Sequence, residues 1–345
     1  MKKISILMTS YNLEDYIDEA IKSVVIQEMP CDWELLIGDD GSVDGTIGSI
    51  EKWINRYPDN IRLFRWAKDD DHVMSGFRAA ANRARLLEQS TGDYIIFLDG
   101  DDSWLGTQKL KEQYEVLERT ENADCSCCGH NIFKVETGSE SPIEIVSTLI
   151  PRRKYSKAEY YKAGLYIHTN TILFRSCCKE LMLRNPYKDF LNDIFITFCL
   201  LQFGKMAYLP EVWAIYNFTG TGLWTGAKNV YSRFRNVHLY DLEVNIDPYF
   251  ERTIFDSMCG NMAVILNNYK IEDVSLITPL IQGLDPTIFK CTLTLYKLDN
   301  LTKEDIKYKR KIKRRFSFSK FRSKIYRELD KLHNIRLRKF AHISF

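Results

Sequence analysis

Long apolar segments are missing from this sequence. No uninterrupted apolar run approaches the ~18 residues of a membrane-spanning helix. The apolar run at residues 4–8 directly follows Lys2 and Lys3 and is too short for the core of a secretory signal peptide. There is also no internal repeat and no low-complexity linker. We therefore expect a globular chain in the cytoplasm, whose cysteines remain reduced thiols.

A second C-x-x-C motif, which would complete the usual framework of a structural zinc site, is missing as well, since only Cys125 and Cys128 have this spacing. The nine cysteines include two clusters, one of Cys125, Cys127 and Cys128 and one of Cys177 and Cys178. Because a reduced cysteine packs as a small apolar side chain, we expect these residues to fill the core.

The formal net charge of +2 conceals an uneven distribution. Lys and Arg greatly outnumber Asp and Glu in residues 303–345, so the rest of the chain is acidic. Phe316, Phe318, Phe321 and Leu329 lie among these basic residues. A basic amphipathic helix of this kind suits an anionic membrane surface. Nucleic-acid binding and a solvated helix packed on the body of the protein are the alternatives.

The first hundred residues alternate between two kinds of apolar pattern. Helical spacing of apolar residues separates short apolar runs, and this alternation predicts an α/β fold with a mostly parallel sheet. The expected strands cover residues 4–8, 33–37, 61–66 and 94–98. Further strands are expected at 124–135, 171–174 and 206–216, a helix at 191–203, and mainly helical structure after residue 226.

Polar clusters follow three of these strands, at residues 9–12, 39–42 and 99–102. Ligands bind beyond the carboxyl ends of the strands in parallel sheets, so we expect the three clusters to share one site. Carboxylates packed as closely as Asp99, Asp101 and Asp102 repel one another unless a cation lies among them. Carboxylate oxygens suit Mg²⁺ or Mn²⁺. The alternative is a run of acidic residues that caps the next helix.

These clusters also resemble a known family. Thr9-Ser10-Tyr11-Asn12, Asp39-Asp40-Gly41-Ser42 and the run from Gly92 to Asp102 match in order and spacing the signatures of glycosyltransferase family 2, which has the GT-A fold. The match covers about the first 105 residues and is looser to residue 226. It implies a Rossmann-like GT-A fold, with nucleotide-sugar binding in 1–105, acceptor binding in 106–226 and a helical C-terminal region in 227–345.

The resemblance assigns donor-site roles residue by residue. It implies that Thr9, Tyr11 and Asp39 line the nucleoside pocket and that Asp99 contacts the ribose. Asp101 would bind the divalent cation, Mn²⁺ or Mg²⁺, on the diphosphate.

Two more residues belong to the implied donor site. Asn82 matches a recurring asparagine beside the donor, with a local structural hydrogen bond as the alternative. Trp224 lies in a glycine-rich stretch that resembles the family's lid over the donor, with an ordinary surface loop as the alternative.

The resemblance also implies an acceptor side. Asp193 occupies the place of the base that deprotonates the acceptor hydroxyl, although it would serve equally as an acidic residue at a helix N-terminus. Asn192 stands where the family usually has an acid. His168 lies in a stretch that runs along the acceptor cleft in the family, although a lone histidine is often structural.

The sequence therefore predicts an inverting glycosyltransferase. We expect it to move a hexose or N-acetylhexosamine from a nucleotide-sugar, with a UDP-sugar as the expected donor. The expected acceptor is a glycan or a lipid-linked molecule at the inner face of the cytoplasmic membrane. We expect no nucleic acid as a partner. A nucleotidyltransferase that makes sugar nucleotides is the alternative enzyme, but residues 9–12 lack the glycine and lysine that grip a triphosphate. A catalytically inactive binding protein is the non-enzymatic alternative.

Overall fold

The computed structural model describes residues 2–66, 75–136, 144–145, 154–162, 167–185 and 187–218, and the single positions 236, 239, 243, 246 and 247. The chain divides into two compact units, Met1–Ser232 and Arg233–Phe345, and every element named below lies in the first. Trp224 and the basic stretch 303–345 lie outside the described residues. Within the described parts, no helix has the length and apolarity to span a membrane.

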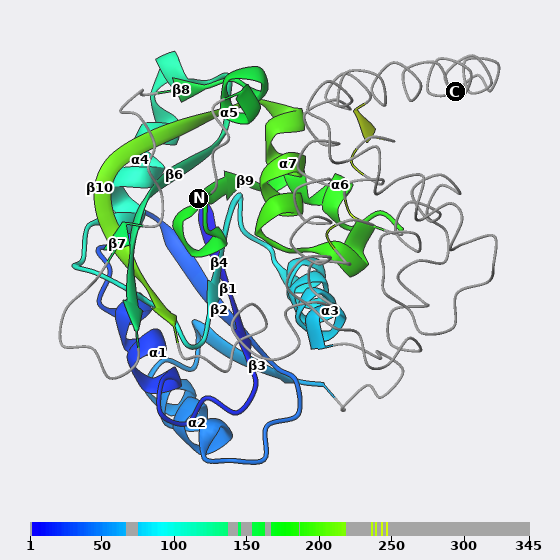
Figure 1. The fold of residues 1–345 in the computed structure, drawn as a ribbon. Coiled ribbons are helices and arrows are strands. Elements are labelled where there is room, and N and C mark those ends of the chain that lie inside the picture. The colour runs from blue at the N-terminus through cyan, green and yellow to red at the C-terminus, as the bar shows by residue number, and fades with distance from the viewer. Residues whose placement is uncertain are drawn as a thin grey trace, which may run out of the picture. The chain divides into compact units, whose positions relative to one another are not determined.

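Four parallel strands form the first half of the sheet, as the alternating pattern predicts, in the order β3-β2-β1-β4. Helices α1 and α2 lie on one face of these strands and α3 on the other (Figure 1). This arrangement follows from right-handed crossovers that reverse direction after β3. The elements are β1 (Lys3–Ser10), α1 (Ile17–Val25), β2 (Asp32–Asp39), α2 (Thr46–Arg56), β3 (Ile61–Arg65), α3 (Ser75–Gln89) and β4 (Tyr94–Asp99).

The second half of the sheet continues from β4 through β9, β6 and β10 to β5. Its longest pair, β6 with β10, is parallel, whereas β9 runs antiparallel to both β4 and β6. The strands are β5 (Ser103–Trp104), β6 (Cys125–Glu136), β7 (Glu144–Ile145), β8 (Lys154–Tyr155), β9 (Leu173–Arg175) and β10 (Lys205–Phe218). The two-residue strands β5, β7 and β8 are not predicted, because two residues are too few to show a period.

Short helices cover this second half. The α-helices are α4 (Lys109–Glu118), α5 (Lys157–Lys162), α6 (Lys179–Met182) and α7 (Asp193–Phe203). The 3₁₀ turns are η1 (Thr120–Asn122), η2 (Thr169–Thr171), η3 (Ser176–Cys178) and η4 (Tyr187–Phe190). The strand expected from residue 171 therefore starts only at Leu173, because η2 occupies the preceding residues.

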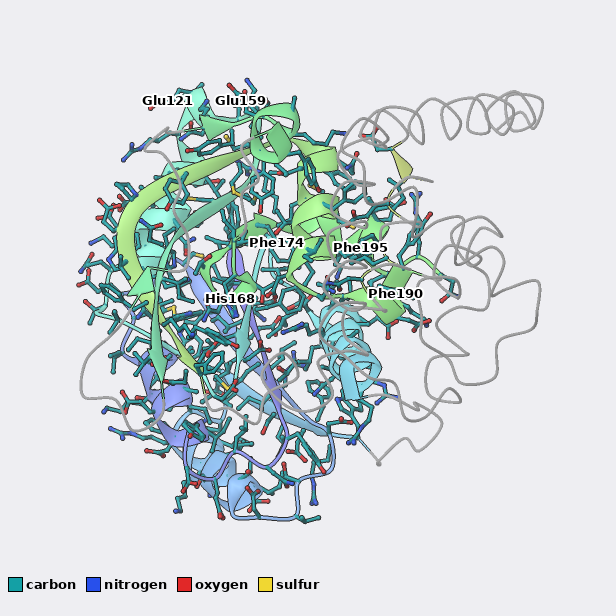
Figure 2. All side chains as sticks on the ribbon, in the orientation of Figure 1. Glu121, Glu159, His168, Phe174, Phe190 and Phe195 are labelled. Atoms are coloured by element: carbon teal, nitrogen blue, oxygen red, sulfur yellow. The ribbon has the colours of Figure 1, made fainter. Side chains whose placement is uncertain are left out.

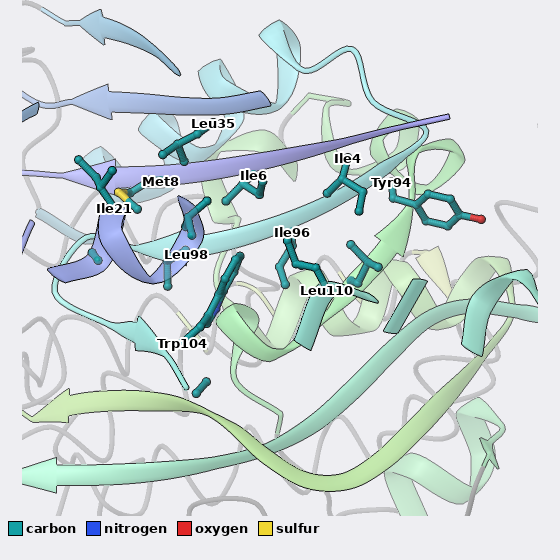
Figure 3. Packing of buried hydrophobic residues seen from close by; sticks show 14 of the residues in the cluster. Ile4, Ile6, Met8, Ile21, Leu35, Tyr94, Ile96, Leu98, Trp104 and Leu110 are labelled. Carbon is teal, nitrogen blue, oxygen red and sulfur yellow. The ribbon is translucent and has the colours of Figure 1, made fainter. Parts of the chain in front are cut away.

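The main hydrophobic core lies against one face of β1. Ile4, Ile6 and Met8 alternate along the strand and share this face, where they join Ile17 and Ile21 of α1 (Figure 3). All five side chains are fully buried. Burial of each such side chain contributes about 1.5–3 kcal/mol, so the strand position is well determined. The core thereby fixes where the carboxyl end of β1 meets its neighbours.

Candidate functional site

The carboxyl ends of β1, β2 and β4 lie side by side. Thr9 pairs with Gly38 of β2 and with Asp99 of β4, and Ser10 pairs with Asp39. The Thr9 hydroxyl donates a hydrogen bond of 2.6 Å to Asp99 Oδ1. The clusters at residues 9–12, 39–42 and 99–102 therefore meet at one edge of the sheet, as expected.

A close backbone contact ties the loop after β4 to β1. The Gly100 amide donates to the Thr9 carbonyl at 2.8 Å. A Cβ atom at residue 100 would lie 2.9 Å from the same carbonyl oxygen and 2.9 Å from Ile17 Cδ1. Only glycine fits without displacing the backbone, which explains the Gly between Asp99 and Asp101.

Asp39 shapes the turn that follows β2. Its side chain is fully buried, and Oδ1 accepts hydrogen bonds from the amides of Gly41 (3.1 Å) and Ser42 (2.8 Å). Oδ2 accepts from the Ser42 hydroxyl. Gly41 has a φ of 85°, a left-handed conformation that glycine adopts without strain. Asp39 thus holds a tight turn at the strand end, and its expected contact with a nucleoside stays a prediction.

Tyr11 presents an open aromatic face beside this turn. Its side chain is 44% exposed, and the Arg78 guanidinium lies 4.9 Å from the ring centroid. Arg78 is anchored to Asp40, donating from Nη2 to both the carboxylate and the main-chain carbonyl at 2.8 Å. An exposed, braced ring of this kind can stack on a planar base. Sequence reasoning missed Arg78, since a single arginine in α3 carries no recognisable signal.

Both polar atoms of the Asn82 side chain form hydrogen bonds within the fold. Its Nδ2 donates to the Gly38 carbonyl at 2.7 Å, and its Oδ1 accepts from Trp66 Nε1 at 2.9 Å. The side chain is buried and lies so close to β2 that a Cβ at Gly38 would meet Oδ1 at 2.1 Å. Asn82 therefore ties α3 to β2 and to Trp66, which directly follows β3, and a donor contact stays a prediction.

Arg83 joins the end of β4 to the segment before α7. Its Nη2 donates to Asp99 Oδ1 at 2.8 Å and Oδ2 at 2.7 Å, and its Nη1 donates to the Leu191 carbonyl at 3.1 Å. Burial alone would raise the pKa of Asp99, but the charge of Arg83 and the hydrogen bond from Thr9 hold that pKa below its usual value. Asp99 is therefore a carboxylate at neutral pH.

The two following carboxyl groups ionise less readily. Burial, and then repulsion from Asp99, raises the pKa of Asp101 to about 6. Burial and the charges of Asp101 and Asp99 raise the pKa of Asp102 well above its usual value. Asp102 accepts hydrogen bonds from Asn170 Nδ2 at 2.9 Å and from the Asn217 amide at 3.1 Å. The ionised forms of Asp101 and Asp102 are therefore disfavoured by burial and by the neighbouring carboxylates.

His168 lies between this loop and the start of α7. It is buried in the interior of the unit (Figure 2). Its Nδ1 is 3.9 Å from Asp102 Oδ2, and its Nε2 is 4.0 Å from Asp193 Oδ2. The ring of Tyr216 from β10 lies 4.9 Å away, centroid to centroid. His168, which is expected on the acceptor side, thus lies close to carboxylates of both the loop 99–102 and the start of α7.

Asp193 and Asn192 begin α7. The Thr169 hydroxyl donates to Asp193 Oδ1 at 2.9 Å. The Asn192 side chain caps the helix by accepting a hydrogen bond of 3.0 Å from the Phe195 amide. The asparagine that replaces the family's acid is therefore a good N-cap, and its contact with an acceptor stays a prediction.

One group of side chains in the described residues has the geometry of a metal site. The ligand atoms of Asp99, Asp102 and His168 all lie within 4.8 Å of one another. Asp101, the predicted ligand, is adjacent in the chain. Sequence reasoning did not select Asp102, which is indistinguishable from Asp101 by spacing alone.

Comparisons with known proteins identify the family and the fold of the chain. The model of glycosyl transferase family 2 matches residues 5–182, more than half of the chain. A putative teichuronic acid biosynthesis glycosyltransferase of Bacillus subtilis, TuaG, is 36% identical over 118 residues, which cover 34% of this chain and 43% of that protein.

Two further matches cover more of the chain. An uncharacterized protein of Mycobacterium tuberculosis is 29% identical over 230 residues, or 65% of this chain, and the match spans only 61% of that relative's own length. The structure of Staphylococcus aureus TarS 1–349 in complex with UDP-GlcNAc has the same fold, with a TM-score of 0.58, 16% identity, and coverage of 85% of this chain and 84% of that one. The chain therefore belongs to glycosyl transferase family 2 and has the GT-A fold.

Proposed function

We propose that this protein transfers a hexose or N-acetylhexosamine, with inversion, from a UDP-sugar to a hydroxyl group of a glycan. The observation that carries the proposal is the meeting of two separate carboxylate groups around His168. The loop 99–102 supplies one and Asp193 the other, at 3.9 Å and 4.0 Å from the two ring nitrogens. One group suits a nucleotide diphosphate held through a cation, and the other suits a base for the acceptor hydroxyl.

The residues present fit a divalent cation, Mn²⁺ or Mg²⁺. Burial, and then repulsion from neighbouring carboxylates, raises the pKa values of Asp101 and Asp102, and a bound cation would favour their ionised forms. His168 Nδ1 is buried and has no hydrogen-bond partner. Asp101 would hold the cation, with Asp102 and His168 beside it. When bound, the ion neutralises charge on the diphosphate leaving group.

The protein's own residues bind the donor and accept the proton of the acceptor hydroxyl. Thr9, Tyr11 and Asp39 bind the nucleoside, with Tyr11 stacking on the base and Asp99 contacting the ribose. Asp193 accepts the proton of the acceptor hydroxyl as that oxygen attacks the anomeric carbon. The hydrogen bond from Thr169 fixes the orientation of the Asp193 carboxylate for this task.

The acceptor is proposed to be a surface glycan or a lipid-linked oligosaccharide. The family relative TuaG is named for teichuronic acid biosynthesis, which is a reaction of this class. The basic, Phe- and Leu-bearing stretch 303–345 would hold the enzyme on the inner face of the cytoplasmic membrane. In this proposal residues 1–105 bind the donor, 106–226 bind the acceptor, and 227–345 form a helical C-terminal region with a basic amphipathic tail.

A donor screen tests the proposal. Thermal unfolding of the full chain is measured with UDP-glucose, UDP-galactose, UDP-GlcNAc and GDP-mannose, each with and without Mn²⁺. We expect a UDP-sugar to raise the melting temperature only with the cation, and that donor to release UDP when a polysaccharide or lipid-linked acceptor is added. Failure of every nucleotide-sugar to bind would refute the proposal.

A further inference from the structure

We propose that His168 is a nitrogen ligand of the divalent cation, so that the site selects Mn²⁺ over Mg²⁺. The inference rests on the proposed function, which requires a cation but leaves its identity open. It adds a residue to the metal site and a reason for the choice of ion.

The first observation is the unused ring nitrogen of His168. The residue is only 7% exposed, and Nδ1 has no hydrogen-bond partner. A buried polar atom without a hydrogen-bond partner destabilises the fold, so the unpaired nitrogen among these carboxylates indicates that it binds a ligand. Asn170, which donates to Asp102, also has a buried side-chain oxygen without a partner.

The second observation is the spacing of the ligand atoms. An ion with ligands at about 2.1 Å in octahedral geometry separates them by about 3.0 Å when adjacent and about 4.2 Å when opposite. His168 Nδ1 lies 3.9 Å from Asp102 Oδ2, between these two values. The ligand atoms of Asp99, Asp102 and His168 all fall within 4.8 Å, so closure on an ion requires side-chain shifts of about half an ångström.

The third observation is the partner of the other ring nitrogen. A metal-bound histidine usually directs its second nitrogen at a carboxylate, which fixes the ring and its tautomer. Here Nε2 faces Asp193 Oδ2 at 4.0 Å, slightly beyond hydrogen-bond length. Nδ1 is therefore the atom available to the ion. The same ring would connect the cation to the carboxylate proposed as the base.

The ligand type then decides the preferred ion. Both ions bind oxygen ligands well, but Mg²⁺ demands near-ideal octahedral oxygen coordination, whereas Mn²⁺, a first-row transition metal, accepts an imidazole nitrogen more readily. A site of oxygen ligands alone would distinguish Mn²⁺ from Mg²⁺ weakly. Replacement of one oxygen ligand by His168 is what makes the site selective.

The test measures ion binding rather than turnover. Binding of Mn²⁺ alone to the full chain is followed by electron paramagnetic resonance, and Mg²⁺ is measured by competition, both without donor and with UDP. His168→Gln replaces the nitrogen with an amide oxygen and keeps a polar side chain. His130→Gln is the matched control, because His130 is also buried with an unpaired Nε2 but lies against Trp213 instead of the carboxylates.

We expect the unmodified protein to bind Mn²⁺ at least about tenfold more tightly than Mg²⁺, and H168Q to lose about tenfold in Mn²⁺ affinity with little change for Mg²⁺. H130Q should keep the preference. Equal affinities in the unmodified protein, or a preference that survives in H168Q, would overturn the inference. Sugar transfer with either ion equally would overturn it while leaving the proposed function intact. Absence of donor binding with every ion would instead refute the proposed function.

Discussion

Arg83 Nη2 donates hydrogen bonds to both carboxylate oxygens of Asp99, at 2.8 Å and 2.7 Å, and Nη1 donates to the Leu191 carbonyl. A single guanidinium therefore links the carboxylate at the end of β4 to the residue just before Asn192 and Asp193. Arginine suits this task because its planar fork donates in two directions at once. Together with Thr169 and Asn170, which bind Asp193 and Asp102, this side chain helps to set the distance between the end of β4 and the start of α7.

Replacement of Arg83 by Lys should weaken donor binding. Lysine keeps the charge but cannot hold Asp99 and the Leu191 carbonyl together. Loss of one charged hydrogen bond, about 1.5 kcal/mol, predicts a rise of at least about tenfold in the donor dissociation constant, measured by calorimetry. Arg85→Lys is the control, because Arg85 lies over the Trp66 ring at 5.3 Å. Equal effects of the two substitutions would argue against the link.

Replacement of Asp193 by Asn should remove the base while preserving the fold. Turnover is expected to fall by about 100-fold or more, with donor affinity unchanged, because a positioned base contributes at least that much. Steady-state kinetics and donor titration measure the two quantities separately. Asp189→Asn, in the preceding turn η4, serves as the control. A D193N protein with full activity would exclude Asp193 as the base.

Replacement of Asp101 by Ala should abolish cation-dependent turnover in a folded protein. The carboxylate is partly buried, and its removal also relieves repulsion with Asp99, so stability without metal should not fall. Circular dichroism checks the fold, and a turnover assay over a range of Mn²⁺ concentrations checks the activity. Unchanged dependence on Mn²⁺ would remove Asp101 from the metal site.

The lowered pKa of Glu34 should make the free energy of unfolding depend on pH. Burial alone would raise its pKa, but hydrogen bonds from Ser5, Thr91 and Lys3 lower it from 4.5 to about 2. The pKa is depressed in the folded state, so the stabilisation is complete above pH 4.5 and is lost as the pH falls towards 2. The shift corresponds to about 3 kcal/mol for this side chain, which is 3% exposed.

Urea unfolding of the unmodified protein and of Glu34→Gln tests this. The variant should be less stable at pH 7 by about 3 kcal/mol and should show a smaller decline in stability between pH 4.5 and 2. Identical pH profiles for the two proteins would show that Glu34 contributes nothing through its charge.

Removal of the chain after Asn300 should release the protein from anionic membranes. Most of the basic residues near the C-terminus lie beyond that point, and each contributes about 1 kcal/mol to binding at a negative surface. Cosedimentation with vesicles of phosphatidylglycerol and phosphatidylcholine measures the loss. Vesicles of phosphatidylcholine alone are the control, and equal binding by the shortened chain would refute the membrane role.

The sequence by itself determined the first half of the sheet and the edge at which its polar residues meet. Apolar runs followed by polar residues at Thr9, Asp39 and Asp99 predict parallel strands whose carboxyl ends meet, because a right-handed crossover leaves little alternative. The register confirms the prediction. Local chemistry was sufficient there, since each polar residue directly follows the strand that positions it.

Only the tertiary structure decided which distant side chains complete the site. Asn217 binds Asp102 across 115 positions of the chain, and His168 comes between Asp102 and Asp193 because β9, β6 and β10 follow β4 in the sheet. The order of those strands is set by long-range packing, which leaves no periodic signal in the sequence. The same packing buries Asp102 and leaves the His168 nitrogen unpaired, so the charge balance of the site is a property of the fold.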